Sequence, residues 1–149
     1  MKRLLLLTLT LFISVSAFAQ TVVNVTDADF GSTDVTWTKD NIYVLTEMIF
    51  VKPGTKLTIE PGTVIKGAVG DGNDATGLVV TMGAQIFAEG TAEEPIIFTS
   101  ELDDLAGSLT ELDRGLWGGV VVLGDAPTNN ATADGTKLIE GVNEIANPE

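Results

Sequence analysis

A pattern of glycine turns and short strands that occurs twice is the feature that most restricts the fold of this chain. In the first copy, the turns Lys52-Pro53-Gly54 and Glu60-Pro61-Gly62 flank the triplet Leu57-Thr58-Ile59. In the second copy, within residues 80–91, a glycine again precedes an aliphatic residue by three positions, and Glu and Gly-Thr follow. Because Pro fixes φ and Gly tolerates positive φ, these turns suit sharp corners. The repeat therefore predicts short strands joined by tight turns.

The alternation within the repeat indicates how such strands are buried. Successive side chains of a strand point to opposite faces, so Leu57 and Ile59 share one face while Lys56, Thr58 and Glu60 share the other. A unit of one strand cannot bury its apolar face alone, but coils stacked on one another bury it continuously. The repeat thus favours a solenoid. An antiparallel sandwich, which also has short strands and glycine turns, is the alternative.

The composition excludes several classes of function. The 149 residues include 8 basic and 21 acidic side chains, with a net charge of −13, and contain no Cys or His. The negative charge argues against nucleic acid and anionic membranes as partners, since both attract Lys and Arg clusters. The absence of Cys excludes disulfides and thiolate metal sites. The absence of His removes the commonest general base and a common zinc ligand.

The N-terminus, residues 1–19, is predicted to be a secretory signal peptide. Lys2-Arg3 supplies the positive start, residues 4–15 the apolar stretch, and Ala17-Phe18-Ala19 the cleavage site, with cleavage after Ala19. A membrane anchor is the alternative, but the apolar run is shorter than the roughly 20 residues that span a bilayer. We therefore expect a protein without a membrane span that is secreted or held at the outer cell surface, or that stays in the periplasm.

Residues 20–41 are predicted to form an N-terminal cap. A solenoid must cover its first open coil with an atypical element. Trp37 or Phe30 is expected to close this end of the core, since a lone Trp is more often buried than exposed. The functional alternative is that Trp37 is an exposed platform on which a sugar ring stacks.

Two polar stretches are candidate Ca²⁺ sites. The loop 67–77 carries Asp71, Asn73 and Asp74, whose oxygen atoms are ligands that Ca²⁺ prefers, although the loop lacks the terminal Glu of an EF-hand. The stretch 101–113 is acidic, and its leucines are spaced loosely at helical period, which would allow a short helix, although Gly107-Ser108 argues against a long one. We expect this stretch to be an excursion from the coil. A solvated loop without metal is the alternative for both stretches.

Residues 42–149 are predicted to form the coils of the solenoid. The aliphatic run 120–123 has no polar alternation, which is typical of a strand buried on both faces. Trp117, just before this run, is expected to pack against the core. Residues 137–141 are expected to form a last short strand, so the chain would be the N-terminal part of a longer solenoid.

Four segments carry a resemblance to a known group of proteins. They are LTIEPGTVIKG (57–67), EGTAEEPIIFTS (89–100), DRGLWGGVVVLGDAP (113–127) and IEG (139–141). In this order they resemble the secreted right-handed parallel β-helix proteins of Bacteroidetes-type bacteria, many of which carry a C-terminal sorting domain for type IX secretion. The resemblance implies an all-β, right-handed parallel β-helix and possible type IX export. It supplies no catalytic residues, and no sorting domain is present in these 149 residues.

Two functions are consistent with these observations. The first is a non-catalytic secreted or cell-surface scaffold without a required cofactor, adhesive or in contact with an extracellular glycan or a surface protein. The second is a polysaccharide-processing, lyase-like enzyme with its site outside this segment, because parallel β-helices also host such chemistry. Within the segment, Arg114 beside Asp113 is the one candidate for a lyase base beside an acid.

Overall fold

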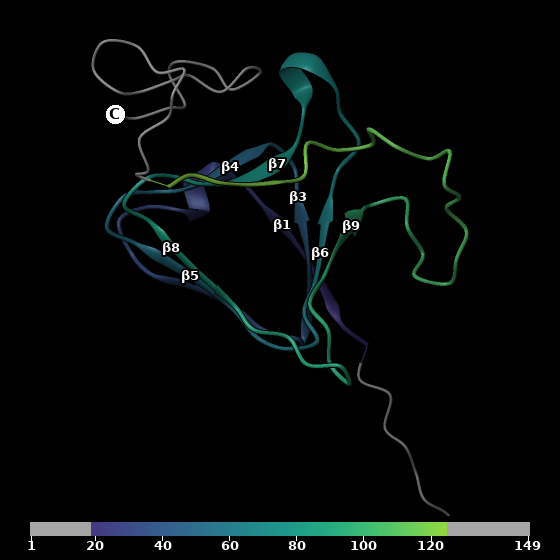
Figure 1. Cartoon of the computed structure of the whole chain (residues 1–149), viewed down its shortest axis with the longest axis horizontal. Helices are drawn as coiled ribbons and strands as arrows, with labels where there is room; N and C mark the ends of the chain where they lie inside the picture. The colour runs from purple at the N-terminus through teal and green to yellow at the C-terminus, as the bar shows by residue number, and fades with distance from the viewer. Residues whose placement is uncertain (1–18, 125–149) are drawn as a thin grey trace, which may run out of the picture.

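The computed structural model describes residues 19–124, in which ten strands form three sheets with parallel pairing throughout. The sheets are the three sides of a triangular prism, seen from one end in Figure 1. Sheet A contains β1 (Thr21–Val25), β3 (Asn41–Leu45), β6 (Val64–Gly67) and β9 (Ile97–Ser100). Sheet B contains β2 (Val35–Trp37), β5 (Lys56–Ile59) and β8 (Gln85–Ala88). Sheet C contains β4 (Met48–Val51), β7 (Gly77–Val80) and β10 (Val120–Val122).

The chain visits the sheets in a fixed cycle. Strands β3, β4 and β5 run along sheets A, C and B in turn, and β6, β7 and β8 repeat the circuit one level higher. The first circuit has β1 and β2, with the short 3₁₀ helix η1 (Asp27–Asp29) between them in place of a sheet C strand. This all-parallel circuit is the right-handed parallel β-helix that the sequence predicts, and the antiparallel sandwich is excluded.

The two copies of the repeat lie directly above one another. Leu57 of β5 is the register partner of Ile86 in β8, and Ile59 is the partner of Ala88. The turns stack as well, because the Gly54 N–H donates a hydrogen bond of 2.9 Å to the Gly83 carbonyl. Leu57 and Ile59 are buried, whereas Lys56 is exposed. The predicted assignment of the two faces is therefore confirmed.

Aromatic rings close the N-terminal end of the core. Trp37 stacks on Tyr43 with ring centroids 4.9 Å apart and meets Phe30 edge-on at 5.7 Å. Only 3% of Trp37 and 2% of Phe30 is exposed, so the sugar-platform alternative for Trp37 is wrong. The segment predicted as the cap, residues 20–41, thus contributes Phe30 and Trp37 together with two strands that pair with the following coil.

Buried threonines hold the corners of the coils. The hydroxyl of Thr63 donates to the Glu60 carbonyl at 2.7 Å, and Thr55 donates to Lys52 at 2.7 Å. Thr81 and Thr76 make equivalent bonds to main-chain carbonyls at 2.7 and 2.6 Å. A buried carbonyl without a partner costs free energy, so these hydroxyls allow the chain to turn inside the stack.

The three kinds of corner differ in how their length changes from coil to coil. The corner from sheet B to sheet A lengthens from 38–40 to 60–63 and then to 89–96. The corner from sheet C to sheet B has the same length in two successive coils, 52–55 and 81–84. The corner from sheet A to sheet C lengthens from 46–47 to 68–76 and then to 101–119. In Figure 1 both long segments project outward from the prism. We call residues 101–119 the excursion.

A single carboxylate covers the lower edge of sheet C, where no strand precedes β4. Asp27 Oδ1 accepts the Phe50 N–H at 2.9 Å, and Oδ2 accepts Lys52 Nζ at 3.0 Å. The N–H of Asp27 in turn donates to Glu47 Oε1 at 2.7 Å. The unpaired edge of a sheet can associate with other strands. At this edge, the charged carboxylate of Asp27 accepts the Phe50 N–H in place of a neighbouring strand.

Replacing Asp27 with Ala is expected to lower the free energy of unfolding by about 1–3 kcal/mol, because the partly buried Phe50 N–H loses its acceptor. Urea denaturation of the secreted chain measures the change. Asp40→Ala is the matched control, since Asp40 is exposed and its carboxylate accepts no hydrogen bond from the described residues. Equal losses for the two variants would contradict the role of Asp27 at this edge.

One local prediction is confirmed, one is wrong, and one group lies outside the described residues. The stretch 101–113 leaves the coil as an excursion, as predicted, and has turns and bends without the short helix that its leucine spacing would allow. The run 120–123 is not buried on both faces, because β10 pairs only with β7 among the described strands and leaves Val120 and Val122 exposed. The predicted signal peptide, except for Ala19, and the predicted strand 137–141 are not described.

Candidate functional site

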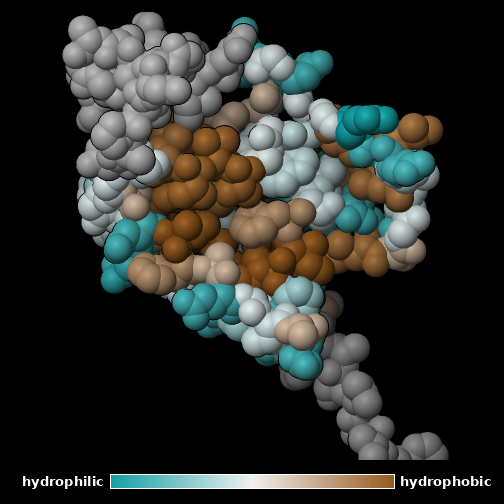
Figure 2. All heavy atoms as spheres, in the orientation of Figure 1, coloured by the Kyte–Doolittle hydropathy of each residue, from teal (hydrophilic) through white to brown (hydrophobic). Residues whose placement is uncertain are grey.

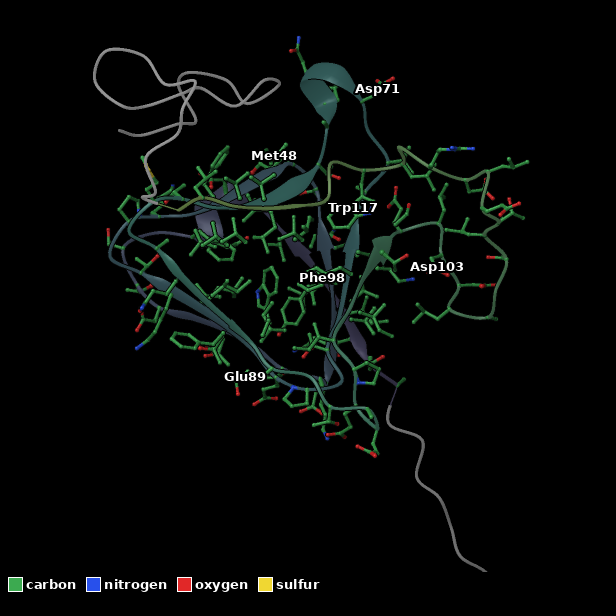
Figure 3. All side chains as sticks on the ribbon, viewed as in Figure 1. Met48, Asp71, Glu89, Phe98, Asp103 and Trp117 are labelled. Carbon is green, nitrogen blue, oxygen red and sulfur yellow. The ribbon has the colours of Figure 1, made fainter. Side chains whose placement is uncertain are left out.

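A cavity of about 240 Å³ opens between β9 and the returning end of the excursion. Its lining combines two aromatic rings, aliphatic side chains, two hydroxyls and one pair of opposite charges: Phe98, Thr99, Ser100, Leu109, Asp113, Arg114, Gly115, Leu116 and Trp117. In Figure 3, Phe98 and Trp117 lie on the inner side of the ribbon, toward the axis of the prism. The cavity is therefore lined by both apolar and polar side chains.

A glycine makes room for one of the two aromatic rings of the lining. Gly67 ends β6 next to Trp117, and a Cβ placed on Gly67 would lie 2.5 Å from the indole ring. Only a residue without a side chain leaves room for Trp117 at this point. Phe98 follows the buried Ile65 in register and reaches the same end of the core. Both rings are half-buried and pack against the core, as predicted for Trp117.

The base of the excursion is tied to sheet A. Glu101 donates its N–H to the Gly67 carbonyl at 2.8 Å, extending the ladder past the end of β9. Lys66 Nζ donates to the Asp103 carbonyl at 2.6 Å, and the Thr99 hydroxyl donates to Asp103 Oδ2 at 2.7 Å. These bonds fix where the chain leaves the prism and so fix one wall of the cavity.

Hydrogen bonds favour the ionised form of Asp103 and Asp113 in the excursion. The Thr99 hydroxyl and then the Leu105 N–H lower the pKa of Asp103. The N–H of Thr110 and then its hydroxyl lower the pKa of Asp113 below its usual value. A hydrogen bond to the charged form of a carboxyl favours that form. Asp113, the one acid in the cavity lining, is thus a loop-closing acceptor and is poorly suited to donate a proton near neutral pH.

Arg114 provides the positive charge of the cavity. It is exposed, and the ion pairs of the described residues join other cations: Lys39 to Glu94, Lys52 to Asp27, and Lys56 to Asp34. Its guanidinium group is therefore available to a ligand. The lyase candidates from the sequence, Arg114 and Asp113, both line this cavity.

The predicted Ca²⁺ ligands lie elsewhere. Asp71, Asn73 and Asp74 are exposed on the loop that contains the short 3₁₀ helix η2 (Gly72–Asp74), and Figure 3 shows Asp71 on this projecting loop, away from Asp103. Across residues 19–124, no three acidic side chains gather in a group that could hold a metal. The predicted set has only two acids and one amide, so the absence of a group of three acids does not test it. Ca²⁺ at Asp71, Asn73 and Asp74 stays a prediction.

The sequence did not reveal Phe98, Thr99, Ser100, Leu109 or Leu116 as parts of a site. Three of them belong to a strand, and the cavity exists only because the chain returns to β9 after a long detour. The available signal was an aromatic residue on each side of an acidic stretch, at 98 and 117. That signal alone does not bring the two ends together.

Comparison with known proteins agrees with this architecture. The family model of the pectate-lyase like beta helix domain matches residues 29–147. The chain belongs to this family. No curated protein and no solved structure was found to match it. In the described part of this pectate-lyase-like β-helix, no helix is long and apolar enough to cross a membrane.

Proposed function

We propose that this pectate-lyase-like β-helix is a non-catalytic scaffold that contacts an extracellular glycan through the cavity beside β9. The observation that carries the proposal is the lining of that cavity: two aromatic rings and the exposed Arg114, with Asp113 as its one acid. Binding sites typically combine an apolar surface with a few polar groups that fix orientation. Glycoside hydrolysis, in contrast, normally requires two carboxyl groups on either side of the bond.

The proposed setting is outside the cytoplasm. The predicted signal peptide, residues 1–19, supports export with cleavage after Ala19. The resemblance to type IX secretion cargo supports display at the outer cell surface, and release into the medium or the periplasm is the alternative. An acidic chain with a net charge of −13 fits this setting, since it stays soluble.

A lyase-like enzyme is the second candidate. It is favoured by the family and by the presence of Arg114 and Asp113 in one cavity. A lyase of this type needs a strong base beside acids that bind Ca²⁺, and here the single acid of the lining is engaged by Thr110 at 2.7 Å. This engagement supports the scaffold, or a catalytic site outside the described residues.

Replacing Arg114 with Gln is expected to weaken binding of polygalacturonate fragments about tenfold or more. A hydrogen bond to a charged group contributes about 1.5–3 kcal/mol, and 1.4 kcal/mol corresponds to tenfold in affinity. Titration calorimetry on the secreted protein measures this change, with neutral cellohexaose as the comparison ligand. Lys56→Gln is the matched control, because Lys56 pairs with Asp34 outside the cavity.

Three outcomes would contradict the scaffold proposal. Absence of binding to either ligand would remove the cavity as a glycan site. Equal affinity of the Arg114 and Lys56 variants would show that binding occurs elsewhere. New reducing ends or unsaturated products during incubation with polygalacturonate would identify a lyase or hydrolase instead of a scaffold.

A further inference from the structure

Sheet B ends one level earlier than the other two sheets. The last circuit of the chain has β9 in sheet A and β10 in sheet C, but within residues 19–124 no strand of sheet B lies above β8. The burial of matching strands reflects this difference. β5, which has β8 above it, buries Leu57 and Ile59, whereas their register partners in β8, Ile86 and Ala88, are half-buried and exposed. The upper edge of β8 and the core beside it are therefore uncovered in the described part.

Inward-facing apolar side chains from all three sheets gather at this end of the prism. Val120 and Val122 are 39% and 63% exposed, although their register partners in β7 belong to the core. Ile86, Phe98 and Trp117 pack against the same core and are half-buried. Figure 2, in which this end faces the reader, shows apolar side chains gathered near the centre of the view. The end coil of a solenoid has to be covered, because its apolar face otherwise stays in water.

The chain itself continues from this end of the prism. β10 ends in sheet C at Val122, and on both earlier circuits the chain passes from sheet C to sheet B, from β4 to β5 and from β7 to β8. The family match extends to residue 147, so the domain continues past the last described residue, Gly124. The next strand of the cycle is therefore expected above β8.

The sequence after Gly124 contains a segment that fits this position. β5 and β8 both end in an apolar residue that Glu follows directly and Gly shortly after: Ile59-Glu60-Pro61-Gly62 and Ala88-Glu89-Gly90. Residues 125–136 contain no Val, Leu, Ile or aromatic side chain, and the same order then recurs in Leu138-Ile139-Glu140-Gly141. When the three copies are aligned on Glu, Ile139 takes the position above Ala88 and faces the core, as Ile59 does.

We propose that residues 137–141 form the fourth strand of sheet B, pair in parallel with β8 and cover the open end of the prism. The inference gives the predicted strand 137–141 a partner and a register, with Glu140 above Glu89. The connection to it, residues 123–136, is longer than the described corners at the same edge, 52–55 and 81–84. Two of the rings that this strand covers, Phe98 and Trp117, also line the cavity beside β9, so the strand supports the proposed glycan site, a consequence that rests on that proposal.

Engineered disulfides test this register directly, because the chain contains no Cys of its own. Neighbouring strands of a sheet lie about 4.7–4.9 Å apart, which is within the Cα separation of about 4.4–6.8 Å that a disulfide bridges. In the full secreted chain, Glu89→Cys combined with Glu140→Cys is expected to form an intramolecular disulfide on mild oxidation. Intact mass after alkylation of the free thiols measures the oxidised fraction.

The matched control combines Glu60→Cys with Glu140→Cys. Glu60 ends β5 one level below Glu89, so its distance from Glu140 is about twice the strand spacing and exceeds the reach of a disulfide. Glu60 and Glu89 are both exposed, so neither substitution disturbs the core. We expect the oxidised fraction of the first pair to be at least tenfold higher than that of the control pair.

Three results would overturn the proposal. Free thiols in both pairs would show that residues 137–141 do not lie on β8. Equal oxidation of the two pairs would show that the segment has no fixed register on sheet B. A disulfide-linked dimer in place of the intramolecular bond would identify a second copy of the chain as the molecule that covers this end. The measurement requires no glycan, so its outcome is independent of the test of the proposed function.

Discussion

Replacing Leu57 with Asp is expected to abolish the cooperative thermal unfolding of this protein. Leu57 is fully buried in the middle of sheet B, with Val35 as its register partner in β2 and Ile86 in β8. Truncation of a buried leucine alone costs about 2–5 kcal/mol. An aspartate adds an unpaired charge in an apolar interior, and the combined cost approaches the roughly 5–15 kcal/mol that stabilises a typical domain. Far-UV circular dichroism during heating measures the loss.

The neighbouring residue provides the control for this experiment. Thr58 points to the opposite face of β5, is half-buried, and is the register partner of Thr36 and Phe87. A charge at this position stays in contact with water, so Thr58→Asp should change the free energy of unfolding by only about 0.5 kcal/mol. If both variants melted alike, the assignment of inner and outer faces to β5 would have to be abandoned.

Replacing Trp37 with Ala is expected to produce the second large loss, about 3–5 kcal/mol of unfolding free energy. Trp37 is 3% exposed and fills the N-terminal end of the prism between Phe30 and Tyr43. The ring of Tyr43 is fixed because its hydroxyl accepts the Thr38 N–H at 2.9 Å. It therefore cannot move into the space left by the indole. The urea midpoint of the secreted chain measures the change.

A conservative variant distinguishes packing from other roles of this indole. Trp37→Phe keeps an aromatic ring between Phe30 and Tyr43 and should recover about half of the lost stability, since less volume is removed. A loss below about 1 kcal/mol for Trp37→Ala would mean that the aromatic cluster does not close the core. Glycan binding should be the same in both variants, because Trp37 does not line the cavity.

The stacked strands could be predicted because their signals are local. The alternation around Leu57 and the glycine turns on both sides are present within about a dozen residues, and they determine the face and the corner directly. The continuous stretch 42–51 was less informative. It divides into β3 and β4 at Thr46-Glu47, where both residues are exposed and the chain turns from sheet A to sheet C.

The candidate site could not be predicted because its signals are distant or competing. The leucine spacing in 101–113 would allow a helix, but Asp103, Asp104 and Asp113 accept N–H groups from neighbouring residues and so compete with helical bonding. The cavity depends on Trp117 meeting Gly67, two residues separated by a whole coil. A sequence pattern carries no information on such a contact until the fold is known.

The unequal corners have a consequence for how this protein can change over time. The corner from sheet C to sheet B keeps its length while the corner from sheet A to sheet C grows from 46–47 to 101–119. Insertions at one corner leave the register of all three sheets intact. Their cost in free energy is small, because loop-closure entropy rises only slowly with loop length. A longer loop can therefore replace a shorter one at this corner, in one coil at a time, while the packing of the core stays the same. The corner from sheet B to sheet A also lengthens, from 38–40 to 89–96, so the prism would act as a constant frame that carries loops of variable length along two of its three edges.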